Sequence, residues 1–444
     1  MSAVPLWTIE AMAKAMGATL QGALPQSVQG LSIDTRTIEK GEAFFALKDV
    51  RDGHDFVEAA LKAGGGLAVV AADQRDRFSK DAPLLVVPDV LEGLIALARA
   101  ARARSSAKFV GVTGSVGKTT VKDLTAEVLR GALVTHASER SFNNELGVPL
   151  TLANAPDDTD AVVVEMGARG RGHIALLCDV ARPTIGVVTM VALAHAEMFG
   201  TVEEVARAKG ELIEALPPSG TAVLNGDDPL VAAMAHRSAA TVVRFGLGAA
   251  MDVTAEDVLL DDRLRAAFTM RTPEGAVPVR LRVHGEHQVT NALAAAAAGL
   301  AAGVDVETIA AGLGRATLSP HRMALLRAES GALVLNDAYN ANPTSMAAAL
   351  QSLASLPARR RVAVLGLMAE LGPGGPAEHR RMADLAASLG IELVAVACAD
   401  YGVEPVADAN AALAVLGPLG EGDAVLVKGS RVAGLEVVAE ALID

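Results

Sequence analysis

Cysteine and long apolar runs are scarce in this chain of 444 residues. Its two cysteines, Cys178 and Cys398, lie far apart, which excludes a disulfide framework and a zinc finger and suits a reducing compartment. The longest apolar run, residues 292–304, is well short of the roughly 20 residues that span a bilayer. The first residues show no basic stretch followed by an apolar run, so no signal peptide is visible. We expect a cytoplasmic protein that is not embedded in a membrane.

Positive charge is also in short supply. The 39 basic residues are outnumbered by 52 acidic ones, which gives a net charge of −13. A protein that binds nucleic acid needs a strongly basic face to neutralise phosphates, so this balance argues against nucleic acid as a partner. Only Lys209 and Lys428 follow Lys122 in the sequence. Compositional bias accounts for this shortage, but it also draws attention to each remaining lysine.

The apolar content is high enough for sizeable cores, at 51% of the residues. At roughly 150 residues per domain, the length predicts about three domains. From residue 108 onward, short apolar runs alternate with helical patterns, as in a doubly wound α/β sheet. The expected strands are residues 109–113, 161–165, 184–190 and 221–225, and the expected helices include residues 94–104, 118–130 and 202–216.

A stretch rich in β character, residues 241–283, precedes an alanine-rich helix after Gln288. A third α/β unit follows a break at residues 318–321. Its expected strands are residues 333–336, 361–366, 392–398 and 424–428, and residues 372–376 are expected to form a loop.

A glycine-rich motif follows the first expected strand of the central region. Residues 111–119, GVTGSVGKT, fit the pattern G-x-x-x-x-G-K-[ST] between a strand and a helix. Glycines let backbone N–H groups approach phosphate oxygens, and the helix N-terminus adds a favourable dipole. Lys118 would neutralise charge on the β- and γ-phosphates, and Thr119 would place its hydroxyl on Mg²⁺. The motif predicts nucleotide binding but does not name the reaction.

Four polar positions outside this loop allow both a functional and a structural interpretation. Glu165 ends a strand at the edge where α/β sheets bind ligands and would coordinate Mg²⁺, or it is a solvated carboxylate. His195 lies in a loop before a helix that starts near Thr201, where a lone histidine is more often structural or exposed. Lys209 would ordinarily be a solvated helix residue, and Asn291 would cap the helix that follows it.

A series of motifs along the chain matches one family. TGSVGKTT, SFNNELGVPLT, EMG, AHAEMFG, AKGE, NGDD, GEHQVTN, SPHRM, NDAYNANPTSM, LGLMAELG and LVKGSR occur in this order. Together they resemble the Mur ligases of bacterial peptidoglycan synthesis, and residues 32–56 resemble that family's uridine-nucleotide-binding segment. FNNELGVPLT and NDAYNANPTSM are most similar to the branch that adds D-alanyl-D-alanine to a UDP-N-acetylmuramoyl-tripeptide. The resemblance covers essentially the whole chain.

The resemblance implies three domains. They are a small N-terminal UDP-muramoyl-peptide-binding α/β domain at residues 1–106, a central P-loop ATPase domain with a mainly parallel sheet at 107–317, and a Rossmann-like ligase domain at 318–444. It also implies an ATP-dependent reaction in which the tripeptide carboxylate becomes an acyl phosphate. The amine of D-alanyl-D-alanine then displaces phosphate and forms UDP-N-acetylmuramoyl-pentapeptide. The implied cofactors are ATP and two Mg²⁺ ions, and the implied form is a monomer.

The resemblance also assigns catalytic and metal-binding roles. Thr119 and Glu165 would hold the Mg²⁺ between the β- and γ-phosphates. His195 would help bind a second Mg²⁺ near the substrate carboxylate. Lys209 matches a lysine that the family carbamylates, which turns a cation into a metal-binding anion. Lys118, Lys209 and His195 are the implied catalytic residues.

Further residues match the ligand-binding positions of the family. Asn291 would contact adenine, and Arg322 and Asp337 would close on ATP from the C-terminal domain. The remaining ATP contacts would come from the loop residues Gly114, Ser115, Val116, Gly117, Lys118, Thr119 and Thr120. Substrate contacts are implied at Ser32, Thr35 and Arg36 for the uridine nucleotide, at Asn143 and Asn144 for the muramoyl-peptide, and at Tyr339, Asn340 and Asn342 for the dipeptide. Capping or turn roles stay open for these asparagines.

Several alternatives remain open at this point. The chain has Gly172-His173-Ile174 where the family usually has Gly-Glu-Ile, and we assign His173 no role. The Asp-Asn-Pro-Arg signature of the branch that adds the third amino acid is absent, and folate-polyglutamate ligases lack FNNELGVPLT. Within the family, the alternative is another amide-forming Mur-type ligase. From a different class, the chain would be a P-loop nucleotide-binding regulator whose ATP hydrolysis ignores both ligase substrates.

Overall fold

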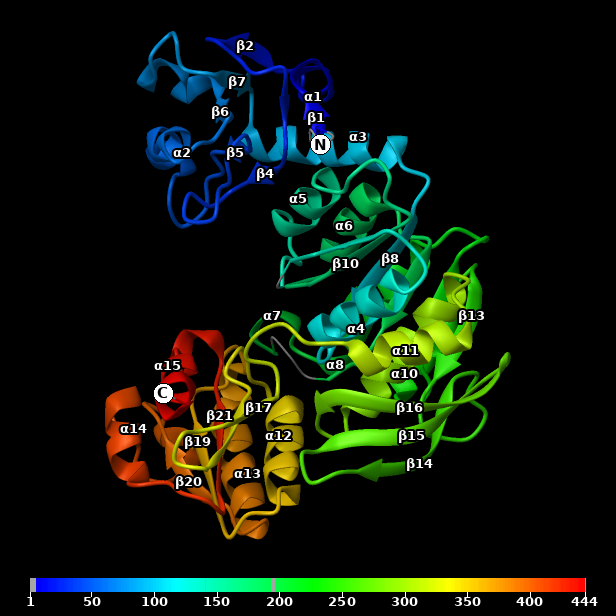
Figure 1. Cartoon of the computed structure of the whole chain (residues 1–444), viewed down its shortest axis with the longest axis vertical. Coiled ribbons are helices and arrows are strands. Elements are labelled where there is room, and N and C mark those ends of the chain that lie inside the picture. Colours follow the sequence, from blue (N-terminus) through cyan, green and yellow to red (C-terminus); the bar gives the residue numbers. More distant parts are fainter. Residues whose placement is uncertain (1–4, 140, 193–195, 444) are drawn as a thin grey trace. The chain divides into compact units, whose positions relative to one another are not determined.

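The structure is a computed structural model and describes residues 5–139, 141–192 and 196–443 (Figure 1). The chain divides into two compact units. Unit 1 comprises Met1–Gly111, Leu133–Met166 and Ala175–Pro183, and unit 2 comprises Val112–Ala132, Gly167–Ile174 and Thr184–Asp444. None of the described helices combines the length and the apolar character that a membrane span requires. The predicted domain boundaries, after residues 106 and 317, remain predictions.

A five-stranded sheet lies in unit 1, with the order β2-β7-β6-β5-β4. Neighbouring strands from β4 to β7 pair in parallel, and β2 is antiparallel to β7. The strands are β2 (Thr19–Gln21), β4 (Leu31–Ser32), β5 (Ala43–Phe45), β6 (Leu67–Ala71) and β7 (Leu84–Val87), and a separate antiparallel pair joins β1 (Trp7–Thr8) to β3 (Ser27–Val28).

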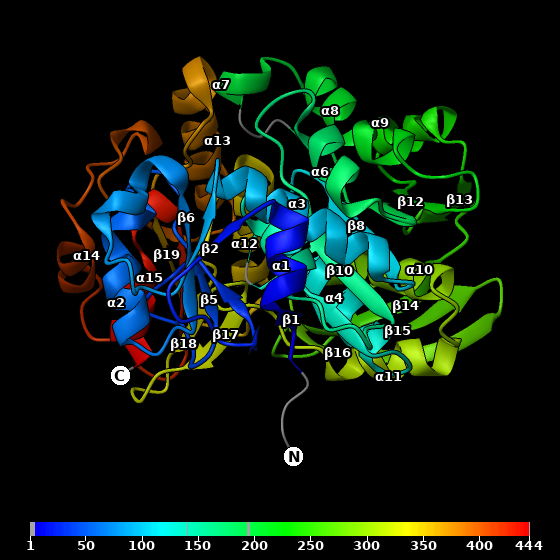
Figure 2. The ribbon, with the colours of Figure 1, turned by 90° about the horizontal axis from the view of Figure 1, so that it is seen from above.

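Alternating apolar side chains give this sheet two buried faces, because successive residues of a strand point to opposite sides. Phe45 and Val69 pack with α1 (Ile9–Met16) and α3 (Val90–Arg104). Phe44 and Val70 pack with α2 (Val57–Lys62) on the other face. Figure 2 shows α2 on one side of β5 and β6, and α1 on the other. The helix expected at 94–104 is therefore confirmed as the later part of α3.

The central sheet has the strand order β13-β12-β11-β8-β10-β9. The pairs β9–β10, β11–β12 and β12–β13 are parallel. Its strands are β8 (Lys108–Thr113), β9 (Thr135–Ala137), β10 (Ala161–Glu165), β11 (Ile185–Val188), β12 (Thr221–Asn225) and β13 (Thr241–Phe245). The helices of this region are α4 (Lys118–Arg130), α5 (Gly147–Ala153), α6 (His173–Ala181), α7 (Ala196–Phe199), α8 (Val202–Glu214) and α9 (Pro229–Ala232).

Two strands and one helix of this region have the predicted bounds, namely β10, β12 and α4. The strand expected at 184–190 is shorter, and the helix expected at 202–216 ends at Glu214. Thr201 caps α8 by accepting the N–H of Glu204 through its side chain. The predicted alternation of parallel strands and helices is therefore confirmed.

An antiparallel sheet and two helices follow in unit 2. The sheet consists of β14 (Thr254–Leu260), β15 (Arg265–Thr272) and β16 (Gly275–His284), and the helices are α10 (Gln288–Ala301) and α11 (Val306–Arg315). Both helices pack against α4, and α11 also packs against β16 (Figure 1). This packing fixes α4, whose N-terminus follows the glycine-rich motif.

The C-terminal sheet has the order β17-β18-β21-β19-β20 and is parallel except for β17. Helices α12 and α13 cover one face, and α14 and α15 cover the other (Figure 1). The strands are β17 (Ala324–Arg327), β18 (Leu333–Asn336), β19 (Arg360–Leu365), β20 (Glu392–Ala395) and β21 (Asp423–Lys428), and the helices are α12 (Pro343–Ser355), α13 (Gly375–Ser388), α14 (Ala409–Leu416) and α15 (Glu436–Ile443).

The carboxyl ends of β18, β19 and β21 lie at one edge of this sheet, because Asn336 pairs with Val427 and Leu365 pairs with Lys428. The loops that follow these strands therefore meet.

The expected loop at 372–376 is wrong, and so is the length of one strand. Residues Gly372–Gly374 form a 3₁₀ helix, and α13 begins at Gly375 with a proline in its first turn, where proline is compatible with a helix. The strand expected at 392–398 ends at Ala395. The 3₁₀ helices are η1 (Gly53–Phe56), η2 (Ala72–Arg77), η3 (Ala233–Arg237), η4 (Gly372–Gly374), η5 (Ala399–Tyr401) and η6 (Arg431–Ala433).

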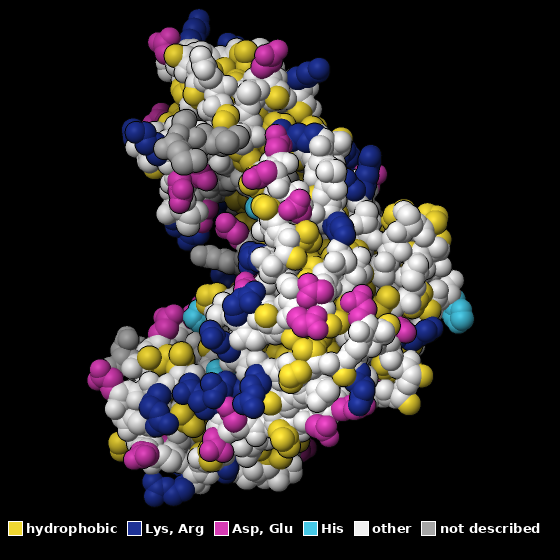
Figure 3. Space-filling model, turned by 45° about the vertical axis from the view of Figure 1, so that its right-hand side comes forward, with side chains coloured by type: hydrophobic (Ala, Val, Ile, Leu, Met, Phe, Trp, Pro, Cys, Tyr) yellow, Lys and Arg dark blue, Asp and Glu magenta, His cyan; other side chains and the backbone are white. Residues whose placement is uncertain are grey.

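Charge is distributed unevenly over the surface. On the face drawn in Figure 3, Lys and Arg side chains gather in the lower part, while acidic side chains are scattered more widely. A net charge of −13 therefore coexists with a locally basic area.

A side-chain amide joins two parts of unit 1. Asn154 accepts the N–H of Leu31 at 2.9 Å and donates to the Leu31 carbonyl at 3.0 Å. The neighbouring Ala153 carbonyl accepts the indole N–H of Trp7 at 2.8 Å. These bonds tie the starts of β4 and β1 to the end of α5.

We expect Asn154→Ala to destabilise unit 1 by about 1–3 kcal/mol, because two backbone groups of Leu31 lose their partner. Trp7 is the only tryptophan, so its fluorescence during urea unfolding reports on this unit. The exposed Asn410, on α14, gives the control variant Asn410→Ala. Equal unfolding midpoints for the two variants would contradict the role of Asn154.

Candidate functional site

The glycine-rich loop between β8 and α4 is packed against the segment that follows β11. A Cβ on Gly114 would lie 1.9 Å from the hydroxyl oxygen of Thr189, and this residue has φ of +151°. The Thr189 hydroxyl donates to the Val116 carbonyl at 2.5 Å. Ser115 donates its backbone N–H to Met190 at 2.8 Å. These contacts fix the backbone of the loop. Only glycine fits at position 114, because a side chain there would overlap Thr189.

Two polar residues, one at the end of the neighbouring strand β12 and one just beyond it, hold this supporting segment. Asn225, at the end of β12, donates to the Thr189 carbonyl at 2.8 Å. Asp228 accepts the N–H of Val191 at 2.7 Å and also caps α9. His195 lies just beyond this segment, outside the described residues, and so its predicted role stays a prediction.

Lys118 and Thr119 occupy the first turn of α4. The Lys118 ammonium donates to the Gly114 carbonyl at 2.9 Å, so it lies over the loop. Arg322 reaches this turn from the segment after α11 and donates to the Thr119 hydroxyl at 3.0 Å. Thr120 is buried in the same turn. The structure thus brings the predicted loop residues and Arg322 together.

Asn291 lies behind the loop, but it does not cap a helix. His287 is the N-cap position of α10, and Asn291 is the fourth residue of that helix. Its side-chain oxygen would lie 2.7 Å from a Cβ placed on Gly117, and its amide donates to Gln288 at 2.8 Å. The capping interpretation is wrong, because the helix begins at Gln288, three residues before Asn291.

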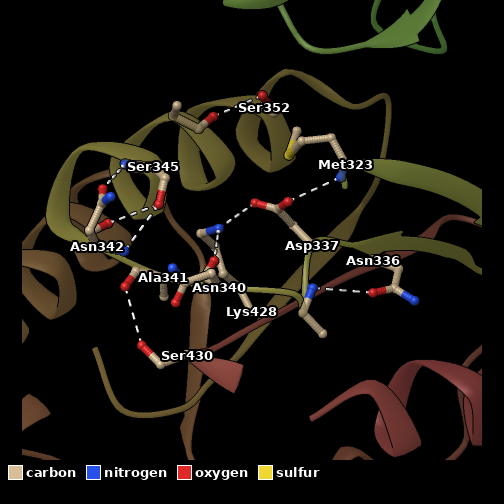
Figure 4. A network of polar contacts seen from close by, with 12 residues as sticks. Met323, Asn336, Asp337, Asn340, Ala341, Asn342, Ser345, Ser352, Lys428 and Ser430 are labelled. Carbon is tan, nitrogen blue, oxygen red and sulfur yellow. Dashed lines mark hydrogen bonds and ion pairs between the residues drawn. The ribbon is translucent and has the colours of Figure 1, made fainter. Parts of the chain in front are cut away.

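A buried ion pair lies at the carboxyl edge of the C-terminal sheet (Figure 4). The Lys428 ammonium donates to the Asp337 carboxylate and to the Asn340 carbonyl, the latter at 2.8 Å. The other carboxylate oxygen of Asp337 accepts the N–H of Met323 at 3.1 Å. Burial lowers the pKa of the Lys428 ammonium, and the negative charge of Asp337 opposes that shift.

The predicted dipeptide residues follow β18 in the same network. Tyr339 is half-buried beneath Arg322, whose guanidinium carbon lies 4.0 Å from the ring centroid. Asn340 is exposed and contributes its carbonyl to Lys428. Asn342 caps α12 in a capping box with Ser345, so its structural role is confirmed and its ligand role stays a prediction.

Lys209 is buried on α8, with 3% of its surface exposed. The solvated interpretation is therefore wrong. Two residues beyond it, Glu211 accepts the N–H of Gly172 at 2.7 Å. His173 accepts the N–H of Arg169 at 3.3 Å, which gives it a local turn contact.

In unit 1, Glu165 and Asn143 lie together. Glu165 is 1% exposed at the end of β10, and its carboxylate accepts the Asn143 amide at 2.7 Å. The interpretation of Glu165 as a solvated carboxylate is therefore wrong. Asn144 accepts the N–H groups of Leu146 and Gly147 at the start of α5, which is a turn role.

The predicted uridine-nucleotide residues surround Asp34, also in unit 1. Ser32 is buried and accepts the N–H of Asp34 through its hydroxyl at 3.2 Å. Arg36 is exposed and donates to both Asp34 oxygens, which raises the pKa of its guanidinium. Thr35 lies between them, half-buried. Asp34 thus positions the guanidinium of Arg36, which is exposed to solvent.

Sequence reasoning missed several residues that organise the site. Asn225 and Asp228 belong to the NGDD motif, to which the sequence analysis assigned no role. Thr189 has no sequence signal, because its partner is a backbone carbonyl. Lys428 and Arg431 belong to the KGSR motif, where the rarity of lysine was the available signal.

The comparisons with known proteins agree with this geometry. Residues 112–299 match the Mur ligase middle domain, and residues 321–431 match the Mur ligase glutamate ligase domain. The UDP-N-acetylmuramoyl-tripeptide–D-alanyl-D-alanine ligase of Mycobacterium tuberculosis is 41% identical over 98% of this chain and 97% of its own length. The protein of the same name from Escherichia coli is 36% identical over 98% of both chains.

Two solved structures have the same fold. MurF from Acinetobacter baumannii has a TM-score of 0.86 at 31% identity and covers 99% of this chain and 100% of its own. MurF ligase from Thermotoga maritima, in complex with ADP, has a TM-score of 0.77 at 25% identity and covers 93% and 96%. The chain therefore belongs to the Mur ligase family and has its three-domain α/β fold. It is an ATP-dependent ligase that forms amide bonds.

We expect Gly114→Ala to reduce ATP affinity at least ~10-fold, because the added methyl group overlaps Thr189 and displaces the phosphate-binding loop. Titration calorimetry measures the dissociation constant. Gly374→Ala is the control, since no atom lies within 4 Å of its added Cβ. Unchanged ATP binding by Gly114→Ala would remove this loop from the nucleotide site.

A pH prediction concerns His287, next to Asp337 and Lys428. Burial lowers the pKa of His287 to about 4; Asp337 opposes the shift and Lys428 reinforces it. A lowered histidine pKa adds stability above the unfolded pKa of about 6.5, and this stability is lost as pH falls toward the folded value.

Between about pH 7.5 and about pH 5, wild type should lose about 2 kcal/mol more stability than His287→Gln. Urea unfolding of both proteins at the two pH values measures the difference. An equal loss in both proteins would show that His287 is not held neutral.

Proposed function

We propose that this chain joins D-alanyl-D-alanine to the carboxylate of a UDP-N-acetylmuramoyl-tripeptide, with ATP as the energy source, in peptidoglycan synthesis. The observation that carries the proposal is the position of Arg322. One guanidinium donates to Thr119 of the nucleotide loop and stacks on Tyr339 of the expected dipeptide segment. Arg322 therefore links the nucleotide loop to the segment that would bind the dipeptide.

The nucleotide loop fits a bound triphosphate and a divalent ion. At Gly114 a Cβ would overlap the Thr189 side chain that supports the loop, so the backbone stays bare there, and Lys118 lies over the loop. We assign Thr119 and Glu165 to the first Mg²⁺ and His195 to the second. When bound, these ions reduce the repulsion between ATP and the substrate carboxylate. The number of Mg²⁺ ions, two, is likewise proposed.

The reaction divides into two steps with balanced atoms. A carboxylate oxygen of the tripeptide attacks the γ-phosphorus, and ADP leaves with the electrons of the broken bond. The free amine of the dipeptide then attacks the acyl carbon, and phosphate leaves with the former carboxylate oxygen. Lys118 and Arg322 would stabilise the phosphate charge. The amine loses one proton when the amide forms.

Lys209 is proposed to act as a carbamate. A carbamate at this buried position would carry a carboxylate, and a metal ion bound to that carboxylate would neutralise its charge. Its position on α8, two residues before Glu211, places it on a rigid helix.

Substrate recognition is assigned to loops of both units. Ser32, Thr35 and Arg36 would contact the uridine nucleotide. Asn143 and Asn144 would contact the muramoyl-peptide, and Tyr339, Asn340 and Asn342 the dipeptide; Asn291 and Asp337 would contact ATP. We also propose a cytoplasmic location, which the buried free thiols of Cys178 and Cys398 support, and a monomeric state, which follows from the family resemblance alone.

Phosphate release with combinations of substrates tests the function. Purified protein, ATP and Mg²⁺ should release phosphate only when UDP-tripeptide and D-alanyl-D-alanine are both present, and mass spectrometry should detect the pentapeptide product. Phosphate release that ignores both substrates would favour a nucleotide-binding regulator. Release with another amino acid or peptide would favour a different Mur-type ligase.

We expect Lys209→Ala to lose ligation almost completely, and added short carboxylates to restore part of it by occupying the vacated space. Lys209→Met is the matched variant, because its side chain fills that space and leaves no room for a carboxylate. If added carboxylates restored ligation in Lys209→Met, or if Lys209→Ala had full activity without them, the carbamate assignment would be contradicted. Initial ligation rates with and without acetate provide the measurement.

A further inference from the structure

Arg431, the first residue of η6 after β21, is a cation without a counter-ion among the described residues. It is exposed, and no ion pair or hydrogen bond joins its side chain to another residue within 5–139, 141–192 and 196–443. Its guanidinium carbon lies 5.4 Å from the centroid of the Tyr339 ring. Because the ring faces attract cations, this contact directs Arg431 toward the segment after β18.

The other two cations at this edge are already committed. Lys428 is 1% exposed and is neutralised by Asp337. Arg322 donates to Thr119 and lies over Tyr339 at 4.0 Å. Of the three, Arg431 alone offers an exposed guanidinium fork to a new anion.

The segment beneath Arg431 is held in place by its own motif. Lys428 binds the Asn340 carbonyl, and Ser430 donates to the Ala341 carbonyl at 3.2 Å (Figure 4). The Ser430 hydroxyl also accepts the N–H of Ala369 from the loop after β19, at 2.9 Å. Lys428 and Ser430 therefore hold the segment that carries Tyr339 next to Arg431.

We propose that Arg431 binds the C-terminal carboxylate of the incoming dipeptide and is thereby a specificity-determining residue. This inference rests on the proposed function. A dipeptide that attacks through its amine keeps one fixed charge, its carboxylate. A planar guanidinium binds that group with two parallel hydrogen bonds, and its distance from the amine leaves the nucleophile free.

The test pairs a change in the enzyme with a change in the substrate. Wild type is compared with Arg431→Gln and Arg431→Lys, using D-alanyl-D-alanine and D-alanyl-D-alaninamide, which lacks the negative charge. Arg327→Gln is the control, because Arg327 is an exposed arginine on β17 whose side chain donates to the Gly331 carbonyl. Steady-state phosphate release gives kcat and KM for each pair.

Wild type and Arg327→Gln should prefer the acid to the amide by ~30-fold in kcat/KM, the range of a charge-assisted bidentate contact. Arg431→Gln should raise the KM for D-alanyl-D-alanine by a similar factor and lose the preference. Arg431→Lys should keep part of it. The KM values for ATP and UDP-tripeptide should stay within about twofold.

Three outcomes overturn the inference. They are an undiminished preference in Arg431→Gln, an increase confined to the KM for ATP, which would assign Arg431 to phosphate, and a wild type that does not distinguish the acid from the amide. Failure of the proposed function is a separate result, because wild type would then release no phosphate in response to D-alanyl-D-alanine.

Discussion

The buried ion pair between Lys428 and Asp337 is the interaction on which the position of the segment after β18 depends. Breaking such a pair leaves an uncompensated buried charge, which costs about 3–5 kcal/mol. Here the pair also fixes two backbone groups, the Asn340 carbonyl and the N–H of Met323. One interaction therefore sets both the segment after β18 and the chain beside Arg322.

A net acidic protein can bind several anions because the positive groups are concentrated locally. The glycine loop offers backbone N–H groups, and Lys118 lies above it. Arg322 serves two neighbours, the Thr119 hydroxyl and the Tyr339 ring. One guanidinium thereby connects the nucleotide loop to the segment after β18.

The sequence predicted those features that arise from local patterns. The alternation of strands and helices identified the α/β fold, and the glycine-rich motif located the loop at Gly114. Contacts between distant segments had no such signal: Thr189 supports the loop through a carbonyl, and Asn154 joins β4 to α5. The sequence suggested Asn291 as a helix cap. The N-cap position of α10 is His287, whose side chain makes no capping hydrogen bond, and so no residue type marked the true start of the helix. The KGSR motif was visible, but its function depends on which strands end together.

Oxygen transfer from the tripeptide carboxylate to phosphate tests the proposed reaction most directly. The UDP-tripeptide is labelled with ¹⁸O in its terminal carboxylate, and the phosphate released in the presence of ATP and D-alanyl-D-alanine is weighed by mass spectrometry. An acyl phosphate intermediate predicts phosphate that carries one ¹⁸O atom from the substrate. Unlabelled phosphate, with its new oxygen taken from water, would contradict ligation and indicate simple ATP hydrolysis.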